Sequence, residues 1–269
     1  MTIGIVLKYK KDNDKDGLIL IADRMFTYLE YGVETEISKI EEIRKLDKIK
    51  IYGIGAGDGT LIRSYFANLD KKLIVYGNPT NDLNVIETSL IDAYNDVIVN
   101  KIRYKVFGTL GIQYNPNDFD RYLNNGIISG QIGGLIQNIW SGLEIVVGIL
   151  LDNNAFVYQI HESEISDSTT QGFGLVGSGS FSALWSLTHL GFNPQMDLKK
   201  ALTLGLIAKF QAEESQGVGK LTDVLIVRSS GDPIALDQEI IESVRKQFDE
   251  LQKSQTEKIN NIANSINLP

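Results

Sequence analysis

The chain has 269 residues, of which 43% are hydrophobic and 22% charged, and its formal net charge is −8. Such a length and composition are those of a globular chain with enough apolar side chains for a sizeable core. The acidic balance disfavours nucleic acid as a partner, because phosphate binding needs a basic surface. The chain has no cysteine and two histidines. This excludes thiolate chemistry and a histidine-rich metal centre, so we expect no metal and no cofactor.

From the opening residues we expect no targeting signal. It opens "MTIGIVLKYK", in which an apolar β-branched run follows one methionine without a charged leader or a cleavage site. The least charged stretch, 126–151, is too rich in glycine and polar residues for a spanning helix of about 20 apolar residues. The sequence thus predicts a cytoplasmic protein with no membrane partner.

The first hundred residues predict strands followed by helices. Apolar runs at 3–9 and 18–22, joined by the polar connector "KKDNDKDG", predict a hairpin. Residues 27–40 predict a second hairpin, and 48–59 predict a strand that runs into the glycine-rich bend "GIGAGDG". Apolar residues at helical spacing then predict helices, which lie at 59–73 and 82–99.

The second half of the chain also predicts strands followed by helices. Two apolar runs around 152–154 predict a hairpin, and the bend "GSGS" leads into a helix that starts near Ser180. A helix over 196–214 and a strand over 222–228 follow, before a long amphipathic helix from about Asp237 to Ile266. Segregated strands and helices with hairpins among the strands predict an α+β domain built of layers.

Thr2 is the first candidate for chemistry. Removal of Met1 would leave a threonine whose hydroxyl can attack and whose own α-amine can take up the proton. The reference pKa of an α-amine is near 8, so a useful fraction is neutral at cellular pH. A core strand that starts at residue 3 would support such a nucleophile rigidly.

Further motifs follow Thr2 in a definite order. Asp23 comes directly after the second strand, and Lys39 lies sixteen residues beyond it in "EISKI". The segments "GIGAGDG", "EIVVGILLDNNAFVYQI", "GFGLVGSGSFSAL" and "EESQGVGKLTDVLIV" then succeed one another. In this order the chain resembles the proteasome β-subunit family of N-terminal nucleophile hydrolases, over residues 2–76 and about 143–228. The resemblance implies a four-layer αββα sandwich with the nucleophile at the start of a central strand.

By position, the resemblance implies catalytic roles for six residues, which are Thr2, Asp23, Lys39, Gly55, Ser178 and Glu214. Thr2 would supply the hydroxyl nucleophile and the amine base. Lys39 would lower the pKa of the hydroxyl and stabilise charge, and Asp23 would hold Lys39 in place. The function implied is a threonine-type peptidase or amidohydrolase that acts through a Thr2 acyl-enzyme, which water or a peptide amine would resolve.

The remaining three residues would complete the site. Ser178 would join the hydrogen-bond network around the amine, and the backbone N–H of Gly55 would form the oxyanion hole. Glu214 would stand for the acidic residue that the family carries after its fourth helix. The partners implied are a peptide or protein substrate and further copies of the chain, as a homo-oligomer or proteasome-like assembly.

The chain also departs from the family pattern. Only Thr-Ile precedes Gly4, and Gly217 stands where the family has a serine. These departures keep two alternatives open: a catalytically inactive structural or scaffold subunit, and an amide hydrolase of the same superfamily that acts on small molecules.

Two segments have no counterpart in the family. We expect a hydrolase domain over 1–233 with an insertion at about 103–142, and a C-terminal helical extension over 234–269. Loops as long as the insertion are uncommon unless they are functional or disordered. We therefore expect an ordered element near the active-site mouth or at a subunit contact.

Overall fold

The fold is described from a computed structural model that covers most of the chain. The described residues are 2–11, 15–28, 33–46, 48–75, 78–79, 81–108, 115, 126, 129–130, 133–135, 142–161 and 164–266. The expectation for the insertion at 103–142 therefore falls mainly outside the described residues.

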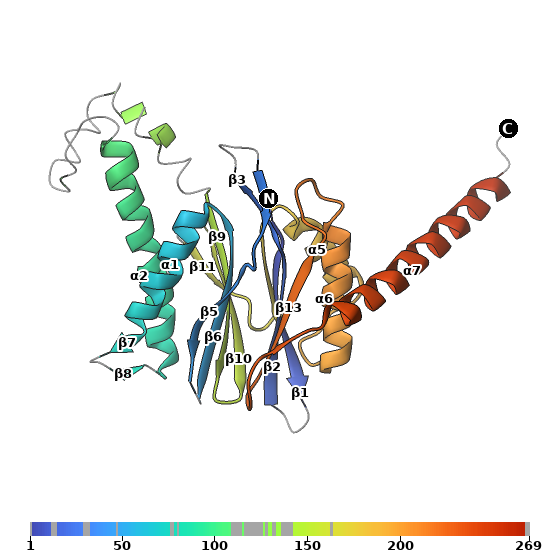
Figure 1. Cartoon of the computed structure of the whole chain (residues 1–269), viewed down its shortest axis with the longest axis horizontal. Helices are drawn as coiled ribbons and strands as arrows, with labels where there is room; N and C mark the ends of the chain where they lie inside the picture. The colour runs from blue at the N-terminus through green and yellow to red at the C-terminus, as the bar shows by residue number, and fades with distance from the viewer. Residues whose placement is uncertain are drawn as a thin grey trace.

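Two five-stranded antiparallel sheets form the centre of the molecule (Figure 1). The first has the order β12 (Phe173–Val176), β1 (Gly4–Lys11), β2 (Lys15–Asp23), β13 (Thr222–Arg228), β14 (Ile234–Ala235). The second has the order β11 (Glu164–Asp167), β10 (Asn154–His161), β9 (Leu143–Leu151), β6 (Ile49–Gly57), β5 (Ile40–Lys45). Two small ribbons pair β3 (Met25–Tyr28) with β4 (Val33–Glu36), and β7 (Ile74–Val75) with β8 (Asn78–Pro79).

The predicted hairpins are confirmed. Strands β1 and β2 pair in the register Gly4↔Ala22, and β3 and β4 form the second hairpin. Strands β9 and β10 are joined by the two residues Asp152 and Asn153, and Asp152 has φ of 54°. A left-handed residue in a two-residue turn matches the twist of the flanking strands.

Helices cover the outer face of each sheet (Figure 1). On the second sheet lie α1 (Gly59–Lys72) and α2 (Leu83–Ile102), followed by a π-helical turn, η2 (Arg103–Phe107). On the first sheet lie α5 (Ser180–His189) and α6 (Leu198–Ala212). The predicted α+β class is confirmed, and the layers run helices, sheet, sheet, helices.

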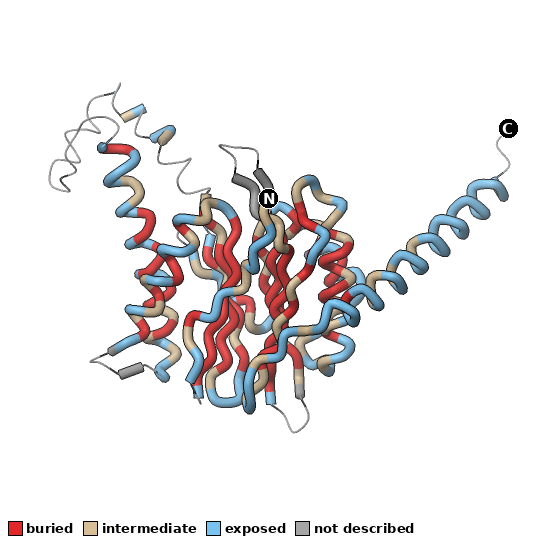
Figure 2. Tube along the Cα trace, in the orientation of Figure 1, coloured by how far each residue is buried: buried red, intermediate tan, exposed pale blue. Residues whose placement is uncertain are grey.

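The alternation along β1 shows why its apolar run is continuous. Ile5 and Leu7 belong to the core between the first sheet and α5–α6, whereas Val6 belongs to the core between the two sheets. Successive side chains of a strand point to opposite faces, so a strand that is covered on both faces must be apolar throughout. The buried residues accordingly fill both central sheets (Figure 2).

The C-terminal helix α7 (Gln238–Ser265) begins on the body and then extends away from it (Figures 1 and 2). Ile241 is buried, and Val244 and Phe248 pack against the α5–α6 core. Beyond Phe248 the large apolar residues are more than half exposed: Leu251, Ile259 and Ile262 on the helix, and Ile266 just past its end. The helix is therefore anchored through its N-terminal half only.

Within the described ranges, no helix combines the length and the hydrophobicity that crossing a membrane requires.

Candidate active site

Thr2 lies two residues before β1, against the bend that precedes α5. It is 8% exposed, and β1 is paired with β2 on one side and β12 on the other. A Cβ at Gly4 would lie 2.5 Å from Ile54 of the opposite sheet, so only glycine allows this close approach. The strand that carries Thr2 is thus held on three sides.

Asp23 is the centre of the hydrogen-bond network at this end of β1. It is fully buried at the end of β2, and its carboxylate accepts hydrogen bonds from three backbone N–H groups. The donors are Ile3 N at 2.9 Å, Met25 N at 3.2 Å and Gly219 N at 3.1 Å. Such charge-assisted bonds fix the carboxylate and tie it to the strand that begins with Thr2.

Lys39 joins Asp23 to Thr2. Its Nζ donates to Asp23 Oδ1 at 2.8 Å and also to the Thr2 hydroxyl oxygen Oγ1, and its side chain is only 8% exposed. Burial lowers the pKa of the Lys39 ammonium below its ordinary value of 10.5, and the Asp23 carboxylate opposes that shift. An ammonium held against a hydroxyl oxygen stabilises the alkoxide, so this contact favours a nucleophilic Thr2.

The "GSGS" bend closes the site from the other side. Gly179 N donates to the Thr2 carbonyl at 3.2 Å, and a Cβ at Gly177 would lie 2.2 Å from that carbonyl oxygen. Gly177 has φ of 94°, and its N–H donates to Glu144 Oε2 at 2.7 Å. Ser178, between these glycines, is exposed and makes no hydrogen bond within the described part of the chain. The bend therefore lies at Thr2, while the predicted role of the Ser178 side chain stays a prediction.

Gly55 lies inside β6, opposite Ile145 of β9. A Cβ there would lie 2.5 Å from Ile62 of α1, so this position also requires glycine. The preceding residue, Ile54, pairs with Ile40, which follows Lys39 in the chain. Gly55 is therefore near the backbone at Lys39, and its role in an oxyanion hole stays a prediction.

Glu214 does not join this cluster. It is exposed just past the end of α6, and its side chain makes no hydrogen bond or ion pair to any described residue. The neighbouring Glu213 is the acid that turns inward, where it binds Lys209 and Arg245. Consecutive helical residues point about 100° apart, so the two neighbours at the helix end have different surroundings.

Gly219 is a site residue that the sequence did not indicate. Its N–H binds Asp23, and a Cβ there would lie 2.6 Å from Met25 and 3.1 Å from Asp23 Oδ2. The signal that could have pointed to it is the glycine pair in "GVGK" just before the last strand. Among the described side chains no group of three or more potential ligands could hold a metal ion.

Comparison with known proteins places the fold. No protein-family model and no curated sequence matches the chain. Three of the solved structures with a similar fold cover nearly all of it. Anbu from Hyphomicrobium sp. strain MC1, as a mutant at Gly-1, has a TM-score of 0.63 at 13% identity and covers 100% of this chain and 99% of its own. Anbu from Yersinia bercovieri, described as an ancestral beta-subunit, has a TM-score of 0.65 at 12% identity. It covers 98% of this chain and 97% of its own.

The third structure is the helical assembly of the Anbu complex from Pseudomonas aeruginosa, with a TM-score of 0.65 at 14% identity over 99% of this chain and 98% of its own. At this identity the likeness shows a shared fold. It also corrects the sequence-based assignment: the chain was expected to be a proteasome β-subunit, and that assignment is wrong, because the matching structures are Anbu proteins.

Proposed function

We propose that this chain is a cytoplasmic N-terminal nucleophile hydrolase that cleaves peptide or amide bonds through Thr2. The observation that carries the proposal is the pair of hydrogen bonds from Lys39 Nζ to Thr2 Oγ1 and to the buried Asp23 carboxylate. The contact of Thr2 with the glycine bend also supports it, since Gly179 N donates to the Thr2 carbonyl, and the chain has a fold similar to that of Anbu.

The reaction follows from these contacts. Once Met1 is removed, the Thr2 α-amine accepts the proton of Oγ1, and Oγ1 attacks the carbonyl carbon of the substrate. The tetrahedral oxyanion accepts hydrogen bonds from backbone N–H groups, for which Gly55 is the proposed donor. The intermediate then collapses, the amine product leaves with the proton held by the Thr2 ammonium, and an ester on Oγ1 remains. Water completes hydrolysis, or a peptide amine completes transpeptidation.

Mass spectrometry combined with an epoxyketone peptide tests the proposal. An epoxyketone closes a ring with both the hydroxyl and the α-amine of an N-terminal threonine. We expect the adduct on chains that begin at Thr2 and none on chains that retain Met1. The matched control is Thr2→Val, which keeps the shape of the side chain and lacks the hydroxyl. An adduct on Thr2→Val, or no adduct on chains with a free Thr2 amine, would contradict Thr2 catalysis.

We further propose that the chain assembles with copies of itself through the outer half of α7. One Anbu complex forms a helical assembly. In the present chain Leu251, Ile259 and Ile262 are each more than half exposed, and with Val244 and Phe248 they fall within one narrow stripe of the helix. An apolar stripe that continues past the body of its own chain fits the same stripe of a second copy.

Truncation separates anchoring from assembly. Ending the chain after Leu251 should leave its melting temperature unchanged and reduce the oligomer mass measured by light scattering. Ending it before Ile240 should also lower the free energy of unfolding by roughly 2–5 kcal/mol, because Ile241 and Phe248 lose their contacts with α6. If the shorter truncation has the mass of the full chain, the outer half of α7 has no role in assembly.

A further inference from the structure

A second buried lysine lies outside the cluster at Thr2. Lys209 is in the last turn of α6 and is fully buried. Its Nζ donates to Glu213 Oε1, to Gly219 O at 2.9 Å and to Lys220 O at 2.8 Å. A buried ammonium is costly unless it is paired, and this one uses two of its three hydrogen-bonding directions to hold backbone carbonyls.

The charge of Lys209 depends on Glu213. Burial lowers the pKa of Lys209 from 10.5 to about 8, and the Glu213 carboxylate is the main influence that raises it. Glu213 is in turn held by Arg245 of α7, whose two terminal nitrogens bind its oxygens at 2.7 and 2.8 Å. Arg245 also donates to Lys220 O at 2.8 Å, and its guanidinium lies 4.2 Å from the centre of the Phe210 ring.

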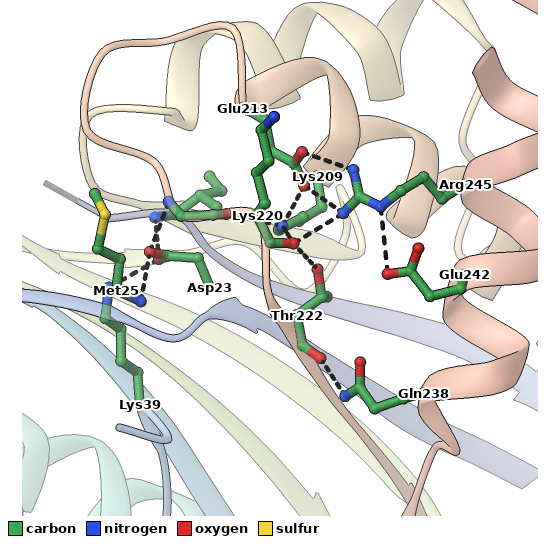
Figure 3. Close-up of polar contacts among 12 residues, drawn as sticks. Asp23, Met25, Lys39, Lys209, Glu213, Lys220, Thr222, Gln238, Glu242 and Arg245 are labelled. Carbon is green, nitrogen blue, oxygen red and sulfur yellow. Dashed lines mark hydrogen bonds and ion pairs between the residues drawn. The ribbon is translucent and has the colours of Figure 1, made fainter. Parts of the chain in front are cut away.

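Gly219 connects this network to the residues beside Thr2. Figure 3 shows the Lys209, Glu213 and Arg245 side chains near Asp23 and Lys39. The Gly219 carbonyl accepts from Lys209, and its N–H donates to Asp23, which binds Lys39. The residue therefore is held on one side by a fully buried ammonium and on the other by the carboxylate that orients Lys39.

We infer that Lys209 is a positioning residue for the Thr2 site, and that Arg245 of α7 supports it through Glu213. The inference rests on the proposed function as far as reactivity is concerned. Lys209 fixes the segment that carries Gly219, so that the Gly219 N–H meets Asp23 and Asp23 holds Lys39 against Thr2.

The variant Lys209→Met isolates this role. Methionine is similar in length and apolar, and Glu213 keeps its bidentate partner Arg245. Lys220 O keeps its bond from Arg245, so Gly219 O is the backbone group that loses its donor. A buried carbonyl without a donor is unfavourable, and the segment is expected to shift.

Two readouts test the inference on the full chain. The first is amide hydrogen exchange, by mass spectrometry, of peptides that span 214–222. The second is the rate at which an epoxyketone peptide modifies Thr2, measured at several peptide concentrations. This gives the apparent affinity for the peptide and the maximal rate of modification. In Lys209→Met we expect faster exchange in these peptides, and a maximal rate about 10- to 100-fold lower at unchanged affinity. Arg245→Met should shift both in the same direction by a smaller factor, and Lys246→Met, an exposed neighbour on α7, should behave as the unmodified chain.

The outcomes are distinguishable. If the unmodified chain with a free Thr2 amine is not labelled, the proposed function fails, and the exchange data alone decide whether Lys209 holds Gly219. Unchanged exchange at 214–222 in Lys209→Met would overturn the inference. So would an increase spread evenly over all peptides, because that pattern reports a loss of overall stability only.

Discussion

Replacing Lys39 by alanine is expected to abolish the reaction of Thr2 with peptide substrates and epoxyketones, with a loss of roughly 10³-fold or more. Lys39 Nζ is the donor that the structure places on Thr2 Oγ1, so the hydroxyl of the variant is an ordinary alcohol. Cleavage of a fluorogenic peptide and labelling detected by mass spectrometry measure the effect. Thr2→Ala should lose activity to the same extent while leaving the Lys39–Asp23 pair in place.

The control for this prediction is Lys71→Ala, which removes an exposed lysine at the end of α1 and should leave the rate unchanged.

The pH dependence gives a second check. Because burial lowers the pKa of Lys39, its charge should be lost on the alkaline side below the ordinary value of 10.5, and the rate should fall with it. Asp23 opposes that shift, so Asp23→Asn should move the alkaline limb to lower pH. Full activity in both Lys39→Ala and Thr2→Ala would exclude the proposed mechanism.

Replacing Asp23 by alanine is expected to have the largest effect on stability, about 3–5 kcal/mol. The variant leaves Lys39 without its counter-charge and removes the acceptor of three backbone N–H groups. For a chain of this size such a loss lowers the melting temperature by roughly 10 °C or more. Thermal melts and urea unfolding measure it.

Two further variants serve as comparisons for the stability of Asp23→Ala. Asp23→Asn keeps the shape and one acceptor oxygen, so it should lose less stability than Asp23→Ala. Asp232→Ala removes a highly exposed carboxylate that pairs with Lys45, and it should melt close to the unmodified chain, because an exposed ion pair contributes little. A melting temperature of Asp23→Ala equal to that of Asp232→Ala would show that the buried pair does not stabilise the fold.

The first part of the site could be predicted because it depends on one hairpin. Pairing of β1 with β2 in the register Gly4↔Ala22 brings Asp23 beside Ile3, and both strands were visible as apolar runs. Lys39 comes only sixteen residues later, at the start of the next strand pair. Because the sequence separations are short and the strands are regular, the family resemblance could be carried over to these three residues by position.

The long-range contacts that support the site could not be predicted in the same way. Gly219 meets Asp23 across 196 residues, and Arg245 meets Glu213 across 32, through the packing of α7 on α6. Nothing in the local pattern of α6 distinguishes the inward Glu213 from the exposed Glu214, and the predicted site residue, Glu214, is the exposed one. The burial of Lys209 could not be predicted for a related reason, since a lysine is ordinarily expected at the protein surface.

The distant partner of Asp23 has a consequence for when the site forms during synthesis. A ribosome presents Thr2, Asp23 and Lys39 long before it presents Gly219, and contacts between such remote segments form late in folding. A nascent chain with a free Thr2 amine would thus lack the completed carboxylate network, and the proposed nucleophile would be unreactive at that stage. The segment that carries Gly219, just before β13, is synthesised 196 residues after Asp23, so the reactivity proposed for Thr2 would depend on a nearly complete fold.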